Sequence, residues 1–123
     1  MSTQNTAVEN FLTAFYAGDA DAARTTITED FTFVGPFATV HGPDEFFKAT
    51  EGLLKIVRGH RVMRHVIEGD NVTTLYDIVL AGPSGEGTVT TSGWFTVTGA
   101  KLSAARLIFD TAQFKAIVSP PPV

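Results

Sequence analysis

Apolar positions near the start of the chain recur every three or four residues. They are Val8, Phe11, Leu12, Phe15 and Tyr16. This spacing gives one apolar stripe along an α-helix. We therefore predict a first helix that ends at Gly18, followed by a shorter helix that Asp19 caps. A third helix begins at Pro43, and its apolar face runs from Phe46 to Val57.

The hydrophobic period changes to two in the second half of the chain. Four alternating segments predict strands, at 61–68, 72–80, 88–97 and 102–110. Two shorter strand-like segments, 31–34 and 37–40, flank Gly35-Pro36 ahead of the third helix. Consecutive strands with short glycine-rich turns are typical of an antiparallel meander. Both faces of segment 72–80 are largely apolar, so this sheet needs cover on both sides, and the fold class is α+β.

Composition narrows the class of protein. The 123 residues, 44% of them hydrophobic, suit one domain with a real core. We place that domain at residues 1–116 and expect the Pro-rich tail 117–123 to be disordered. The net charge of −4 and the absence of a large basic cluster argue against a nucleic-acid partner. No apolar run approaches the length of a membrane span, and we expect a cytoplasmic protein with no membrane partner.

Metal and thiol chemistry find no support in the sequence. The chain has no cysteine, which excludes disulfides and a thiolate nucleophile. His41, His60 and His65 lack the spacing of a metal site and have no clustered carboxylates beside them. We therefore expect neither a metal nor an organic cofactor.

Short local motifs, taken in order, resemble a known superfamily. They are Phe15-Tyr16-Ala17-Gly18-Asp19, Thr28-Glu29-Asp30-Phe31, His41-Gly42-Pro43-Asp44, Gly93-Trp94-Phe95, and Lys101-Leu102 with Ile108-Phe109-Asp110. Their order resembles the nuclear-transport-factor-two-like superfamily, within its SnoaL-like and limonene-epoxide-hydrolase-like branch. The resemblance implies a cone-shaped barrel, in which a curved mixed or antiparallel sheet wraps around about three N-terminal helices. It also implies an apolar pocket and a homodimer through the convex face of the sheet, without implying one activity.

Ketosteroid isomerase is the first activity in this superfamily to test. The resemblance places its base before a proline in the first strand region, its acid on the penultimate strand and its tyrosine on the first helix. The matching residues here are Gly35, Gly93 and Phe11. None of the three can supply the required group, so we exclude this activity.

Epoxide hydrolase and polyketide cyclase mechanisms meet a similar difficulty. The residues that match the hydrolase's Arg, two Asp, Tyr and Asn are Leu75, Asp77, Leu107, Phe33 and Gly35. Only Asp77 keeps its chemistry, and without an arginine beside it the carboxylate loses its charge partner. SnoaL-type cyclases carry their essential acid at the position of Leu107. Both known mechanisms are therefore disfavoured.

Asp77 is the remaining candidate for catalysis. Alternation puts Leu75, Asp77 and Val79 on one face of their strand, which we expect to line the pocket. The other expected lining residues are Tyr16, Phe31, Phe33, Phe37, Phe95, Leu107 and Phe109. Burial there would raise the pKa of the carboxyl group, which suits a general base or acid near neutral pH, with His65 as its partner in an acid/base dyad. The alternative is that Asp77 holds the strand through a hydrogen bond.

Residues that alternate with these inward-facing positions are expected on the outer face of the sheet. Tyr76, Trp94 and Arg106 fall there, and large aromatic residues on that face favour a subunit contact. Asp110 also falls there, and we expect it to bind backbone amides or Arg106.

Three functions stay open. One is a cofactor-independent isomerase, dehydratase or hydrolase that uses Asp77 on a small hydrophobic substrate. Another is a binder of a small apolar molecule without chemistry. The third is a dimerisation module whose 10 phenylalanines fill the cone.

Overall fold

The computed structural model describes residues 3–119, which form four helices and one six-stranded sheet. The helices are α1 (Thr3–Tyr16), α2 (Ala20–Arg24), α3 (Gly42–Ile56) and α4 (Thr111–Val118). The strands are β1 (Ile27–Val34), β2 (Thr39–His41), β3 (Val57–Glu68), β4 (Asn71–Gly82), β5 (Gly85–Thr98) and β6 (Lys101–Phe109).

The sheet has the order β2-β1-β6-β5-β4-β3. The strands β3 to β6 form the predicted antiparallel meander, and β1 joins it by pairing parallel to β6. This parallel pair needs a crossover, which the chain makes through β2, α3 and the meander itself. The mixed α+β sheet that the sequence predicted is therefore confirmed.

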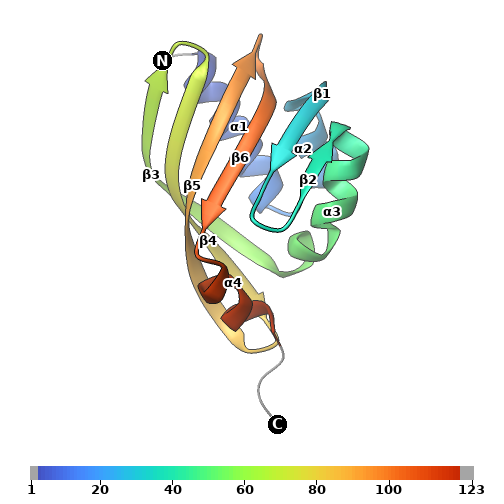
Figure 1. The fold of residues 1–123 in the computed structure, drawn as a ribbon, viewed down its shortest axis with the longest axis vertical. Helices are drawn as coiled ribbons and strands as arrows, with labels where there is room; N and C mark the ends of the chain where they lie inside the picture. Colours follow the sequence, from blue (N-terminus) through green and yellow to red (C-terminus); the bar gives the residue numbers. More distant parts are fainter. Residues whose placement is uncertain (1–2, 120–123) are drawn as a thin grey trace.

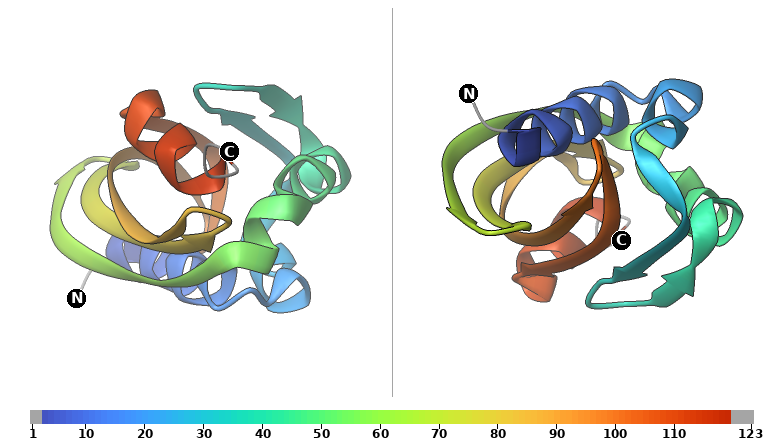
Figure 2. Two further views of the ribbon diagram at one scale, coloured as in Figure 1. Left: turned by 90° about the horizontal axis from the view of Figure 1, so that it is seen from below. Right: turned by 90° about the horizontal axis from the view of Figure 1, so that it is seen from above.

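The sheet curves strongly around the first helix. Figure 1 shows α1 behind β3 to β6, while α3 lies beside β1 and β2. Seen from either end in Figure 2, the strands curl into a cone around an interior that α1 and α4 help to close. Register shifts occur between β1 and β6, within β3, and near the end of β5. Such irregularities bend strands and increase their twist, which suits a strongly curved sheet.

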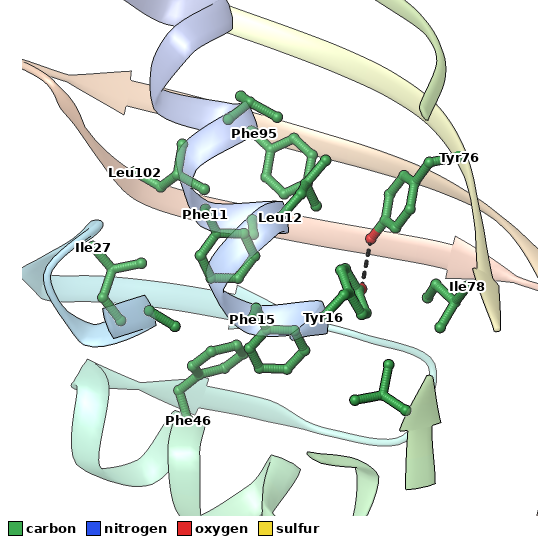
Figure 3. Close-up of a cluster of buried hydrophobic side chains, with 14 of the residues drawn as sticks. Phe11, Leu12, Phe15, Tyr16, Ile27, Phe46, Tyr76, Ile78, Phe95 and Leu102 are labelled. Atoms are coloured by element: carbon green, nitrogen blue, oxygen red, sulfur yellow. Dashed lines mark hydrogen bonds between the residues drawn. The ribbon is translucent and has the colours of Figure 1, made fainter. Parts of the chain in front are cut away.

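Aromatic side chains from several elements cluster in the interior of this cone (Figure 3). Phe46 of α3 is 1% exposed, and its ring lies within 6.1 Å of the rings of Phe11, Phe15, Phe31 and Phe33. Offset or tilted ring pairs at such distances add to the stabilisation that burial itself provides. One cluster therefore joins α1, α3 and β1.

Several boundaries differ from the sequence-based expectation, and the first strand already begins at Ile27. The third helix ends at Ile56, and Val57 already belongs to β3, so Gly59 lies within a strand instead of ending the helix. The chain also forms α4, which the alternation of the last strand did not predict. Asp110 caps α4 by accepting hydrogen bonds from the backbone N–H groups of Ala112 and Gln113, which confirms its expected role as a binder of amides.

The segment expected to be a disordered tail begins inside α4. Ile117 and Val118 belong to that helix, and Ile117 is buried. Residues 120–123 lie outside the described residues.

Two glycines allow α4 to pack against the β4–β5 hairpin. A Cβ atom at Gly82 would lie 2.2 Å from the carbonyl oxygen of Ile117, and one at Gly87 would lie 2.7 Å from the Ile117 side chain. The hydroxyl of Ser84 donates to the carbonyl oxygen of Ser119 at 2.6 Å and fixes the end of the helix. Helix α4 can therefore pack at this place because Gly82 and Gly87 have no side chains.

We predict that Gly82→Ala loosens α4 and lowers the free energy of unfolding by about 1–3 kcal/mol, since the new methyl group meets backbone. Hydrogen exchange at residues 111–118 should rise, and thermal unfolding should shift down. Gly52→Ala is the matched control, because Gly52 in α3 has no neighbour within 4 Å and alanine favours helix. Unchanged exchange at α4 in Gly82→Ala would contradict this account.

Candidate functional site

An apolar cavity lies between the helices and the sheet. Its volume is about 150 Å³. Its walls come from α1, the β1–β2 connection, α3, the sheet and α4. The lining residues are Tyr16, Phe33, Gly35, Pro36, Phe37, Ala38, Ala49, Thr50, Leu53, Ile78, Leu80, Val89, Leu107, Phe109 and Phe114. A smaller void of about 30 Å³ lies deeper, against Phe11, Phe15 and Phe95.

Three phenylalanines from different elements meet beside this cavity. The ring centroids of Phe37, Phe109 and Phe114 lie between 5.3 and 6.0 Å apart. Phe37 is nevertheless 55% exposed, so this cluster borders solvent. It forms the mouth of the cavity, and α4 supplies one side of that mouth through Phe114.

Polar groups are scarce in the lining. Tyr16 and Thr50 are the lining residues with a polar side chain. The hydroxyl of Thr50 donates to the carbonyl oxygen of Phe46 at 2.9 Å, so its proton is used within α3. Tyr16 therefore carries the polar chemistry of the cavity wall.

The hydroxyl of Tyr16 is paired with a second buried phenol. Its oxygen lies 2.9 Å from the hydroxyl oxygen of Tyr76 on β4, and Figure 3 shows the two side chains pointing toward each other beside Ile78. Tyr16 is 3% exposed and Tyr76 is 0% exposed. Burial raises the pKa of both phenols, and in Tyr16 the hydrogen bond from Tyr76 opposes that rise. Both groups are therefore neutral hydrogen-bond donors at physiological pH.

His60 lies against the same phenol. Its ring centroid is 5.5 Å from that of Tyr16, and its pairing with Ile78 directs it toward the interior. Burial lowers the pKa of the imidazole, while the negative charge of Glu9 acts in the opposite sense. The imidazole beside Tyr16 is therefore neutral near pH 7. Sequence reasoning considered His60 only as a metal ligand and rejected it because the spacing of a metal site is missing.

Five of the predicted lining residues are brought together in the cavity. They are Tyr16, Phe33, Phe37, Leu107 and Phe109. Phe95 lines the smaller void, and Phe31 is 0% exposed within the aromatic core.

The predicted orientation of Leu75, Asp77 and Val79 is wrong. Along β4 the buried residues are Val72, Thr74, Tyr76, Ile78 and Leu80, which leaves the other parity on the outer face. Leu75 is 43% exposed. The three residues do share one face, as alternation requires, but the larger apolar set takes the interior.

Asp77 forms a small polar cluster on that outer face. Its carboxylate accepts a hydrogen bond from the hydroxyl of Thr90 at 2.8 Å and contacts the guanidinium of Arg61 at 3.4 Å. These partners sit directly across from it on β5 and β3. Asp77 therefore bridges three strands and does not enter the cavity, which matches the alternative that it holds the strand.

His65 makes no pair with Asp77, so the predicted dyad is also wrong. Its Nδ1 lies 2.7 Å from the hydroxyl of Thr74, and its Nε2 lies 2.7 Å from a carboxylate oxygen of Glu9. Thr74 faces the interior, and Glu9 belongs to α1. His65 therefore fastens α1 to the sheet from the face opposite Asp77.

Tyr76 was expected on the outer face and is instead fully buried. Trp94 and Arg106 do lie on the outer face, paired side by side on β5 and β6. The error for Tyr76 has the same cause as the one for Asp77, because both depend on which side of β4 faces inward.

Aromatic rings occupy the space beside the two glycines that replace the isomerase acids. A Cβ at Gly93 would lie 2.6 Å from the ring of Phe95 and 3.1 Å from that of Tyr76. A Cβ at Gly35 would lie 2.9 Å from the ring of Phe33. An acidic side chain at either position would have to displace a ring, so the exclusion of this activity also has a steric basis.

Within residues 3–119, no three side chains of the metal-binding kind are grouped around a common point. No helix in that same part of the chain is long and apolar enough to cross a membrane.

Comparison with known proteins identifies the family. The SnoaL-like domain family matches residues 8–104, so the chain belongs to this family. A comparison with curated proteins found no match.

Solved structures agree with this assignment. A putative SnoaL-like polyketide cyclase from Jannaschia sp. CCS1 is 25% identical, with 95% of this chain and 94% of that chain covered and a TM-score of 0.76. An NTF2-like protein of unknown function from Burkholderia pseudomallei K96243 is 17% identical, with 97% and 99% covered and a TM-score of 0.83. A hypothetical protein with a ketosteroid isomerase-like fold from Catenulispora acidiphila DSM 44928, in complex with trimethylamine, is 16% identical, with 94% and 93% covered and a TM-score of 0.80. The last two likenesses show the shared fold.

We predict that Asp77→Asn leaves the cavity unchanged and lowers the free energy of unfolding by less than about 1 kcal/mol, because its ion pair with the exposed Arg61 is weak. Chemical denaturation measures the stability. Chemical shifts of Leu53, Leu107 and Val89 methyl groups report the cavity. Large shifts of these methyl signals would instead place Asp77 in contact with the cavity.

Proposed function

We propose that this SnoaL-like domain binds a small, predominantly apolar molecule in the cavity of the cone. The supporting observation is the cavity of about 150 Å³, whose lining is apolar apart from the side chains of Tyr16 and Thr50. Pockets for small molecules are concave and mostly apolar, with few polar groups that orient the ligand. The relative from Catenulispora acidiphila was crystallised with the small molecule trimethylamine, which supports the same use of this fold.

The size of the cavity limits the occupant. An apolar cavity of about 150 Å³ in another protein binds benzene. The present cavity also has a mouth bordered by Phe37 and Phe114, so a ligand can extend toward solvent. A molecule with one ring or two fused rings is the matching class.

Binding is favoured over the Asp77-dependent isomerase, dehydratase or hydrolase. The lining residues include no carboxylate, and the Asp77 carboxylate is engaged on the other side of the sheet. A general base must come within hydrogen-bond reach of the proton that it removes. A filled dimerisation module is disfavoured in turn by the open volume.

The test of this proposal is the binding of indane, a bicyclic hydrocarbon, measured by isothermal titration and by methyl chemical shifts. We expect saturable binding that shifts the Leu53, Leu107 and Val89 signals. Leu107→Trp should weaken binding at least about tenfold, because the larger side chain occupies the cavity.

Leu75→Trp is the matched control, since Leu75 is on the outer face and outside the cavity. It should bind indane like the unaltered protein. Absence of indane binding by the folded, unaltered protein would refute a small-molecule pocket of this kind.

We also propose that the outer face of the sheet joins two copies of the chain. Val66, Leu75, Trp94 and Ile108 are exposed there by 43–57%, on four adjacent strands. An exposed apolar patch of this kind marks an interaction surface. Tyr76 takes no part, because it is buried in the core.

Charge on this face favours a second copy as the partner. A groove of about 590 Å³ runs past Trp94, with Glu68 of β3 and Arg106 of β6 among its lining residues. The order of strands places these opposite charges on either side of β5. A two-fold axis through the face between them would bring Glu68 of one copy to Arg106 of the other, as a self-complementary interface requires.

We predict that Trp94→Lys raises the dissociation constant of the dimer at least about tenfold, because it puts charge into the apolar centre of the face. Sedimentation velocity over a range of concentrations measures this, with Thr13→Lys on exposed α1 surface as the control. Glu68→Arg should also weaken association, and the double variant Glu68→Arg/Arg106→Glu should restore it. A monomer at all concentrations, or a dimer indifferent to all of these changes, would rule out this interface.

A further inference from the structure

The buried phenol pair has more donor capacity than its one hydrogen bond uses. Each tyrosine hydroxyl has one proton to donate. The contact of 2.9 Å between the Tyr16 and Tyr76 oxygens uses one of the two protons. Among the described residues 3–119, neither hydroxyl has another hydrogen-bond partner. One of the two O–H groups therefore has no acceptor for its proton in these apolar surroundings.

Access to the cavity decides which proton is free for a ligand. Tyr16 lines the cavity, whereas Tyr76 is fully buried and is not among the lining residues. Phe95 and the backbone at Gly93 pack closely on the side of Tyr76. Tyr16 is therefore the phenol of the pair that a ligand in the cavity would contact, and Tyr76 can satisfy its own proton by donating to the Tyr16 oxygen.

Energetics favour an acceptor on the ligand. A buried donor without a partner costs free energy that a hydrogen bond to the ligand would recover. A chain of two O–H donors, from Tyr76 to Tyr16 to the ligand, also strengthens each bond by polarisation. Because burial raises the pKa of both phenols, they stay protonated over the physiological range.

We infer that Tyr16 donates a hydrogen bond to a single acceptor oxygen on the ligand, and that Tyr76 is a positioning residue that orients the Tyr16 hydroxyl. The ligand class is then a small cyclic molecule, apolar apart from one carbonyl or ether oxygen. A carboxylate ligand does not fit, since the lining residues offer no cationic side chain. This inference rests on the proposed small-molecule pocket and specifies its ligand.

A matched pair of probes tests the inference. Indane and 1-indanone have the same fused-ring skeleton, and the ketone adds one acceptor oxygen. We expect the unaltered protein to bind 1-indanone about 3- to 10-fold more tightly than indane by isothermal titration, which is the worth of one hydrogen bond. Tyr16→Phe should abolish this preference for the ketone over indane.

The infrared carbonyl stretch of bound 1-indanone gives a second readout. A hydrogen bond from Tyr16 shifts this band to lower frequency than in an apolar solvent. We expect the shift to disappear in Tyr16→Phe and to become smaller in Tyr76→Phe, where Tyr16 keeps its proton but loses its donor. If the role of Tyr76 were purely structural, the band in Tyr76→Phe would lie at the same frequency as in the unaltered protein.

Two further variants keep the result interpretable. Tyr16→Phe/Tyr76→Phe removes both partners together, so that no hydroxyl is left unsatisfied and the fold is retained. Thr91→Val is the control, because Thr91 is a buried hydroxyl next to Tyr76 on β5 whose proton goes to the carbonyl oxygen of Val89. Thr91→Val should keep the preference for 1-indanone, and the double tyrosine variant should lose it.

The outcomes separate this inference from the proposed function. Equal affinity for the two probes, or a preference that survives in Tyr16→Phe, overturns the role of the phenol pair and leaves the apolar pocket standing. Failure of both probes to bind overturns the pocket and the inference with it. A ketone preference lost with Tyr16 and retained in Thr91→Val establishes the inference.

Discussion

The packing of Phe46 against four aromatic rings is the constraint on which the rest of this structure depends. Phe46 comes from α3, whereas its partners come from α1 and β1, so one cluster fixes three elements that are distant in sequence. A small void of about 30 Å³ lies among these rings. The cavity of about 150 Å³ adjoins this cluster, and Tyr16 and Phe33 line both the cavity and the small void. The position of the cavity therefore depends on where the aromatic core lies, and α4 forms one border of the cavity.

The spacing of apolar residues along the chain was enough to predict most of the architecture. The stripe from Val8 to Tyr16 predicted α1, and the period-two segments predicted the meander from β3 to β6. Helix α4 was missed because its eight residues follow a strand directly and precede a run of prolines. The signal that could have found it was Asp110, an N-cap residue whose side chain accepts from Ala112 and Gln113.

The candidate site was harder to predict because β4 is apolar on both faces. Alternation correctly grouped Leu75 with Asp77 and separated both from Tyr76. It could not say which group faces inward, since that depends on what packs against the sheet. The inward choice for Asp77 rested on a resemblance to hydrolases, and the contact of Tyr76 with Tyr16 decides the matter the other way. A strand with one apolar face and one polar face would have shown from its sequence which face lies inward.

The same contact explains why the chemistry of this chain differs from that expected of an acid-bearing pocket. Gly93 lacks a side chain, and the space that a side chain would need is taken by the rings of Phe95 and Tyr76. An acid at that position would therefore have to displace the Phe95 ring and would press against the Tyr76 ring. The interior gains two neutral phenols, whose raised pKa values suit donation of a hydrogen bond and not removal of a proton. The proposed recognition of a neutral, oxygen-bearing molecule therefore rests on the same packing that leaves no room for an acidic group at Gly93.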